Sequence, residues 1–154
     1  AALKKKQFSK YDFSRLHPGG NLGKLLKTVG DIMVSGTKIP FINENKNMKE
    51  ALKTISKKRL GVVIAQNKKK ITTGIITDGN VRKLRQKNID FQKIMIKKVM
   101  TKNPITISSD TLAVKALRIM NEKKITSLCV QKSNKLDKTI GLIHIHHILD
   151  ANIE

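Results

Sequence analysis

The second half of this chain repeats the first half. Met33 and Met100 each end a short apolar segment, and Gly74 and Gly141 each begin an apolar run. Each pair is separated by 67 positions (100 − 33 and 141 − 74). Internal repeats indicate a fold built from similar units, and the seam between two similar units is a natural place for a ligand.

The chain length limits how such units can be stable. The chain has 154 residues, and a unit of ~60 residues buries only about 60% of its surface, which makes it marginally stable alone. We therefore expect the two repeats to share a core. Aromatic residues make up only 3% of the chain and Trp is absent, so aliphatic side chains, Met and Ala must build that core.

The first repeat, residues 29–88, alternates short apolar strands with amphipathic helices. Asn47 is the expected N-cap of one helix and Asp78 that of the next. Four apolar side chains of the first of these helices follow the i, i+3, i+4, i+7 spacing of a buried face. They are Met48, Ala51, Leu52 and Ile55. The expected strands are 40–42, 60–65 and 71–77.

The second repeat, residues 89–154, has the same order of elements, with Asp110 as the expected N-cap of its main helix. The expected strands are 105–107, 126–130 and 139–144. Ala51 matches Ala116 at a separation of 65 (116 − 51), so the first repeat carries two additional residues near 35–38. Each unit has the order helix–β–α–β–β–α.

The charge is strongly positive, with 32 Lys and Arg against 11 Asp and Glu and a net charge of +21. The lysine runs at 4–6, 57–58, 68–70 and 97–98 lie in different segments, and no aromatic residue is interleaved with them. A base-stacking platform is therefore not expected, and nucleic acid is an unlikely main partner. The positive field favours small anionic ligands, phosphates especially.

Two further features concern the cellular setting. No apolar stretch approaches the ~20 residues that cross a bilayer, so no membrane partner is expected. Cys129 is the single cysteine and lies in an apolar run, which favours a buried small hydrophobe over a nucleophile. One cysteine cannot form an internal disulfide, which fits a reducing cytoplasm.

Residues 1–28 belong to neither repeat. They hold three of the five aromatic residues, Phe8, Tyr11 and Phe13. We expect this arm to pack on the repeats, on another chain or on a further domain. The first residues lack the order of a signal peptide, and the chain is expected to be the middle of a longer protein.

Residues 74–80 have the sequence Gly-Ile-Ile-Thr-Asp-Gly-Asn. Together with a helix ending in Met and a pair of apolar strands, this pattern resembles the CBS domain family, whose tandem pairs are called Bateman modules. The resemblance covers residues 29–154 and implies an α/β fold of two β-α-β-β-α repeats with a pseudo-two-fold axis. In that family the end of this motif holds a nucleotide's ribose and phosphate between the repeats, which implies ligand-binding roles for Thr77, Asp78 and Asn80.

A more specific resemblance comes from the segment 13–26 together with residues 29–33. Residues 13–26 have the sequence Phe-Ser-Arg-Leu-His-Pro-Gly-Gly-Asn-Leu-Gly-Lys-Leu-Leu. It is similar to the junction between the sugar-isomerase domain and the CBS pair in the D-arabinose-5-phosphate isomerase family. This implies that the parent enzyme interconverts ribulose 5-phosphate and arabinose 5-phosphate, which feeds 3-deoxy-D-manno-octulosonate (Kdo) for lipopolysaccharide. His17 would be catalytic in that enzyme only, and we expect residues 1–154 alone to be inactive.

Residues 77–82 and 144–147 resemble the two ligand-facing segments of the same family. Arg82 is a candidate clamp for a phosphate or a sugar carboxylate, and His144 and His146 are candidates for contacts from the other half. The family usually has an acidic residue where Asn80 and His147 stand, and an imidazole cannot imitate a carboxylate, so the two related sites are expected to be unequal. No Cys lies near these histidines, and neither a metal nor a cofactor is expected.

The sequence leaves two classes of function open. The first is the nucleotide-sensing module of an isomerase, with the CMP-linked form of Kdo as feedback ligand and a homo-dimer formed through the CBS pairs, or a tetramer in the full-length protein. The second is a free-standing CBS adaptor that binds an adenine nucleotide or nucleic acid. The His-Pro-Gly-Gly segment at 17–20 favours the first.

Overall fold

The computed structural model describes residues 21–132 and 138–153. After α3 (Asn21–Leu25), the first half contains α4 (Val29–Ile32), the 3-10 turn η1 (Gly36–Lys38), β1 (Phe41–Asn43), α5 (Met48–Lys58), β2 (Val62–Gln66), β3 (Thr72–Thr77) and α6 (Asp78–Gln86). The second half contains α7 (Ile96–Val99), β4 (Thr101–Lys102), β5 (Thr106–Ser108), α8 (Ala113–Lys123), β6 (Ser127–Gln131), β7 (Gly141–His144) and α9 (Ile145–Asp150). The predicted order of elements is confirmed. None of the described helices is long and apolar enough to cross a membrane.

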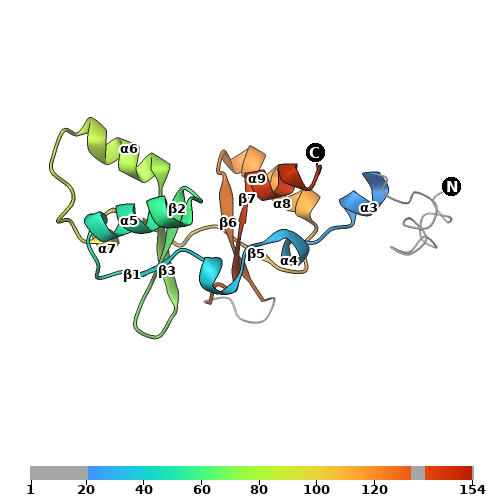
Figure 1. The fold of residues 1–154 in the computed structure, drawn as a ribbon, viewed down its shortest axis with the longest axis horizontal. Coiled ribbons are helices and arrows are strands. Elements are labelled where there is room, and N and C mark those ends of the chain that lie inside the picture. The colour runs from blue at the N-terminus through green and yellow to red at the C-terminus, as the bar shows by residue number, and fades with distance from the viewer. Residues whose placement is uncertain (1–20, 133–137, 154) are drawn as a thin grey trace.

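The strands form two sheets that lie side by side (Figure 1). One sheet has the order β1-β2-β3-β4, and the other has the order β5-β6-β7. In each sheet the first pair of strands is parallel and the next pair is antiparallel. The hydroxyls of Thr72 and Thr139, again 67 positions apart, lie 2.6 Å from each other. This self-contact of equivalent residues marks the pseudo-two-fold relation between the halves.

The first helix of each repeat packs on the sheet of the other repeat. Val29 of α4 is buried in the core of the second sheet, and Ile96 of α7 is buried in the core of the first. The strand after α7 follows the same exchange, because β4 pairs antiparallel with β3. In the other direction Val34 and Leu142 exchange two backbone hydrogen bonds of 2.9 and 3.0 Å. Figure 1 shows α7 beside the first sheet and α4 beside the second.

The repeated Met and Gly residues meet at this exchange. A Cβ atom on Gly74 would lie 2.6 Å from the Met100 sulfur and 2.8 Å from the Thr101 carbonyl oxygen. A Cβ atom on Gly141 would likewise overlap the Met33 sulfur. Only glycine lets each exchanged segment lie this close to its strand. Because the same Met–Gly contact occurs once in each half, the two Met residues and the two Gly residues have the same separation of 67 positions.

The two sheets share a core, as the length of each unit predicted. A cluster of five buried side chains contains residues of both repeats. They are Ile39, Val62, Ile64, Cys129 and Leu142. Burial raises the pKa of the Cys129 thiol to about 12, so at neutral pH this side chain is an apolar core residue and not a nucleophile.

Two of the predicted helix caps are wrong. Thr77, and not Asp78, is the N-cap of α6, because its hydroxyl accepts from the Asn80 N–H while the Asn80 side chain accepts from the Thr77 N–H. Leu112, and not Asp110, precedes α8, and its side chain makes no capping bond. The chain just before α4 caps the helix instead, since the Lys27 carbonyl accepts from the Ala113 N–H at 2.8 Å.

Replacing Gly74 with Ala should lower the free energy of unfolding by about 1–3 kcal/mol, the usual cost of overpacking. The Thr101 carbonyl cannot retreat without breaking the pairing of β3 with β4. Gly79→Ala is the matched control, because a Cβ there meets its nearest atom at 3.5 Å and Ala favours a helix. Urea unfolding measures both variants, and equal stabilities would contradict the close approach.

Candidate functional site

A cleft of about 390 Å³ lies between the two repeats. The first repeat contributes Gly61, Val62, Ile75, Thr77, Asp78, Gly79 and Arg82 to its lining. The second contributes Thr101, Asn103, Pro104, Ile105, Lys124, Ile125, Thr126, Ser127, Cys129, Leu142 and His144. The segment 101–105 reaches the first repeat because β4 pairs with β3, so the exchange of segments builds this site.

The lining contains both apolar and polar side chains. Val62, Cys129 and Leu142, all buried, belong to the core cluster shared by the sheets. Hydroxyl groups and charged side chains, among them those of Arg82 and Lys124, make up much of the remainder. Such a site suits a ligand that combines a flat apolar ring with hydroxyl and anionic groups.

Four of the predicted ligand residues come together in this cleft: Thr77, Asp78, Arg82 and His144. The side chains of Asp78 and His144 come from opposite repeats, and the Asp78 carboxylate acts on the imidazole electrostatically. His146 is not among the lining residues. His17 lies outside the described residues.

Asn80 does not line the cleft but holds two residues that do. Its side-chain oxygen accepts from both the backbone N–H and the hydroxyl of Thr77, each at 2.9 Å. Its NH₂ group donates to the Thr101 hydroxyl at 3.3 Å. The amide therefore fixes α6 against the exchanged strand β4. The Thr77 hydroxyl has its single proton engaged, so it meets a ligand as an acceptor unless it changes partner.

The histidines of the second repeat reproduce this cap. His144 and His147 are the equivalents of Thr77 and Asn80, at 67 positions further on. The Nδ1 atom of His144 accepts from the His146 N–H at 3.1 Å, and Nδ1 of His147 accepts from the His144 N–H at 3.2 Å. The His144 and His146 rings stack at 4.9 Å. The sequence did not predict that an imidazole fills the capping role of Asn80.

Both capping imidazoles favour the neutral form. Burial is the main cause that lowers the pKa of His144, and the neighbouring His146 and His147 lower it further against the opposing Asp78. Burial also lowers the pKa of His147, against the opposing charge of Asp150. An Nδ1 atom that accepts a backbone N–H must be unprotonated, so the hydrogen bonds and the pKa shifts agree. Among the described residues no group of three His, Cys, Asp or Glu is placed to hold a metal.

The related position on the other side of the pseudo-two-fold axis is built differently. The two additional residues of the first repeat lie in the region of the three-residue turn η1 (Gly36–Lys38). The Lys58 ammonium donates to the carbonyl of Thr37 within this turn. The equivalent segment of the second repeat, 101–105, instead contains β4 and lines the cleft. The two halves therefore present unequal surfaces to a ligand.

Sequence reasoning missed the contribution of Thr101, Asn103 and Lys124. Asn103 and Lys124 both have a left-handed backbone, with φ of 52° and 56°. The available signal was their position, since Asn103 follows Met100 and Lys124 ends the main helix of its repeat. That signal becomes informative only when the exchange of segments is known.

The CBS domain model matches the chain twice, over residues 29–87 and 96–154. This chain belongs to the CBS domain family. Arabinose 5-phosphate isomerase KdsD of Yersinia pestis is 37% identical over 154 residues, and that of Escherichia coli K12 is 36% identical over the same length. Each alignment covers 99% of this CBS chain and 46% of the relative. The chain therefore spans about half the length of the curated relatives it matches.

Solved CBS structures have the same fold. CBSX2 in complex with AMP superposes with a TM-score of 0.67 at 21% identity, covering 81% of this chain and 95% of that one. A CBS domain pair in complex with 5′-methylthioadenosine and S-adenosyl-L-methionine gives a TM-score of 0.71 at 22% identity, covering 81% and 94%. The predicted tandem CBS fold is confirmed.

Stability should fall as the pH is lowered from 7 to 5. The unfolded chain takes up protons near the ordinary His pKa of 6.5, whereas folded His144 and His147 take them up only at lower pH. The unfolded state thus binds more protons in this window. The double variant His144→Thr/His147→Asn places the Thr–Asn cap of the first repeat at the equivalent positions of the second repeat. Its stability should depend less on pH. Urea unfolding measures the free energy of unfolding of both proteins across this pH range. An equal change in the two proteins would refute the prediction.

Proposed function

We propose that this chain is the ligand-sensing CBS pair of a D-arabinose-5-phosphate isomerase. The observation that carries the proposal is the cleft between the repeats, which combines an apolar wall with hydroxyl and cationic groups. The relatedness to the two isomerases over 99% of the chain supports the choice of parent enzyme. The parent would interconvert ribulose 5-phosphate and arabinose 5-phosphate in the cytoplasm, with His17 among its catalytic groups.

The proposed ligand is an acidic sugar nucleotide, CMP-Kdo or a close relative. The base would lie on the apolar wall near Val62 and Leu142, as flat rings favour such surfaces. The ribose hydroxyls would be held by Thr77 and Asp78. Arg82 would bind the phosphate or the sugar carboxylate, because its guanidinium forms charge-assisted, bidentate hydrogen bonds with such groups.

A second candidate is a free-standing adaptor that binds an adenine nucleotide. Solved relatives in complex with AMP and with S-adenosyl-L-methionine favour this candidate. The two candidates differ in the base that the cleft accepts. Comparing CMP-Kdo, CMP and AMP on one protein preparation therefore separates them.

Isothermal calorimetry should show one molecule of CMP-Kdo bound per chain, since the two related surfaces are unequal. Arg82→Ala should weaken binding by about 10–100-fold and Thr77→Ala by about 2–10-fold, as expected for charged and neutral hydrogen bonds. Arg85→Ala, one turn along α6 and outside the cleft, is the matched control and should bind like the wild type. Two equal sites, or unchanged affinity in both variants, would place the ligand elsewhere.

Residues 1–154 alone should not isomerise arabinose 5-phosphate, whereas the full-length parent should. An aldose–ketose isomerase needs a carboxylate base for proton abstraction. We expect that base in the sugar-isomerase domain of the parent. A coupled assay for ribulose 5-phosphate, run on both proteins at equal concentration, measures this. Turnover by residues 1–154 that is lost in His17→Ala would show that a complete active site lies within this chain.

A further inference from the structure

Two residues from opposite repeats face the same cleft with opposite hydrogen-bonding character. Asp78 of α6 and His144 at the end of β7 both line the cleft. The Asp78 carboxylate lies against the backbone of Gly61, another lining residue, since a Cβ atom on Gly61 would be 2.8 Å from the Asp78 Oδ2 atom. Among the described residues this carboxylate has no ion-pair partner. An ionised carboxylate is an acceptor only, so Asp78 can bind a ligand group only if that group donates.

The helix cap decides which ring nitrogen of His144 carries the proton. The Nδ1 atom of His144 accepts from the His146 N–H at 3.1 Å, and burial lowers the pKa of His144, which keeps the ring neutral at pH 7. A neutral imidazole has a single N–H proton, so here that proton is on Nε2. No described residue accepts a hydrogen bond from this Nε2 atom. His144 therefore meets a ligand as a donor.

Thr77 occupies the equivalent position of the first repeat and has the opposite character. Its hydroxyl donates to the Asn80 side-chain oxygen at 2.9 Å, so only the lone pairs of the hydroxyl are available to a ligand. At the ends of the equivalent strands β3 and β7, the cleft therefore has an acceptor on the first repeat and a donor on the second. A ligand that matches both residues binds in one orientation, although the two repeats have the same fold.

We propose that His144 and Asp78 hold one hydroxyl group of the ligand's ribose between the two repeats. A hydroxyl is a donor and an acceptor at once, so it can donate to the Asp78 carboxylate and accept from the His144 Nε2–H. An anionic oxygen would satisfy His144 alone and would be repelled by Asp78. The inference rests on the proposed function, because it requires a nucleotide in the cleft, but it applies to CMP and AMP alike. It makes His144 a residue that determines specificity for the sugar.

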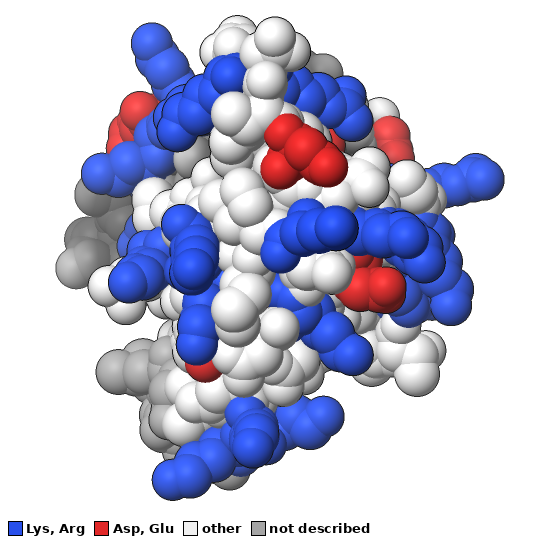
Figure 2. Space-filling model, turned by 90° about the vertical axis from the view of Figure 1, so that its left-hand side faces the viewer, with Lys and Arg blue, Asp and Glu red and all other residues white. Residues whose placement is uncertain are grey.

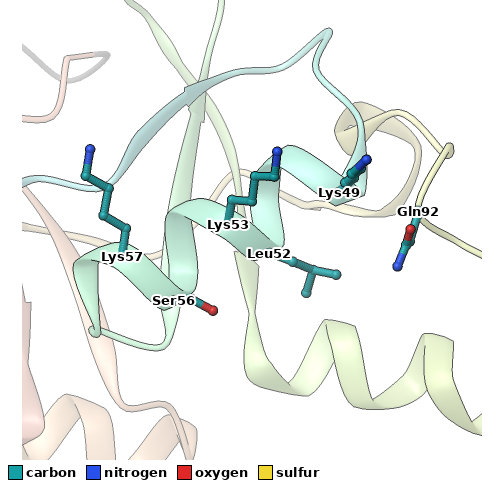
Figure 3. Close-up of a pocket in the computed structure, with 6 residues that line it drawn as sticks. All are labelled: Lys49, Leu52, Lys53, Ser56, Lys57 and Gln92. Atoms are coloured by element: carbon teal, nitrogen blue, oxygen red, sulfur yellow. The ribbon is translucent and has the colours of Figure 1, made fainter.

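The outer side of the first repeat lacks this pairing. Figure 2 shows Lys and Arg gathered around an uncharged centre on this side, with few acidic residues. The hollow along α5 is lined by Lys49, Leu52, Lys53, Ser56, Lys57 and Gln92. Figure 3 shows its three lysines on one side of α5, with Leu52 and Ser56 on the other. This surface attracts anions but has no carboxylate to accept from a sugar hydroxyl, so we assign the sugar to the cleft.

The test compares ribose with deoxyribose in nucleotides that bind the 154-residue chain. Calorimetry measures the affinity of CMP, of AMP and of the 2′-deoxy and 3′-deoxy forms of each. The wild type should bind one of the two deoxy forms about 10–100-fold more weakly than the ribonucleotide, because Asp78 and His144 lose their shared partner. His144→Thr keeps a capping oxygen, but its hydroxyl proton would be engaged as that of Thr77 is. This variant should reduce the discrimination by about 3–10-fold.

Two further variants separate the donor from the cap. His144→Asn can cap the helix with its oxygen while its NH₂ group remains a donor, so it should discriminate like the wild type. His146→Thr is the matched control, because His146 is exposed and does not line the cleft, and it should leave the discrimination unchanged. Equal effects of His144→Thr and His146→Thr, or a His144→Asn variant that behaves like His144→Thr, would overturn the inference.

Two other results would also overturn it. Nitrogen-15 shifts of the His144 ring should show a protonated Nε2 and a bare Nδ1 at neutral pH, and the opposite tautomer would remove the donor. Equal affinity of the wild type for the ribonucleotide and both deoxy forms would contradict the shared hydroxyl while leaving the proposed function intact. If neither CMP nor AMP binds, the proposed function fails together with this inference, so the two failures are distinguishable.

Discussion

The close approach of a methionine sulfur and a strand glycine, once in each half, holds this molecule together. Met100 over Gly74 and Met33 over Gly141 allow the first helix of each repeat to cross onto the sheet of the other. Neither repeat then has a complete core of its own, which fits the marginal stability of a unit this small. The cleft depends on the same crossing, because the segment after Met100 forms one of its walls. Folding and ligand binding therefore rest on a single packing arrangement.

The C-terminal ends of β3 and β7 show how the fold and the proposed binding site use the same residues. Thr77 and Asn80 close the N-terminus of α6 on each other, and Asn80 also holds the Thr101 hydroxyl. His144 and His147 do the same for α9 with ring nitrogens. Thr77, which is proposed to touch the ligand, is thus fixed beforehand by a helix cap, which lowers the cost of ordering it on binding. The second cap is sensitive to protonation, whereas the first is not.

Most of the fold could be predicted from the sequence because it depends on local patterns. The spacing of Met48, Ala51 and Ile55 identified α5, and the apolar runs identified the strands. The exchange of α4 and α7 could not be predicted, since apolar periodicity shows which face is buried but not against which sheet. Because the exchange was not foreseen, the cap of α8 was wrongly expected at Asp110, whereas the Lys27 carbonyl takes this role. The place of Asn103 in the cleft was missed for the same reason. Thr77, Asp78, Arg82 and His144 were foreseen as neighbours through their motif.

Nuclear Overhauser effects between the methionine methyl groups and the glycine α protons test the exchange most directly. In a chain labelled at Met methyl and Gly positions, we expect cross-peaks from Met100 to Gly74 and from Met33 to Gly141, since each pair is in contact. They should persist on dilution, because the exchange is within one chain. Cross-peaks that are absent, or that pair Met33 with Gly74 and Met100 with Gly141, would show that each repeat keeps its own first helix and would contradict the account.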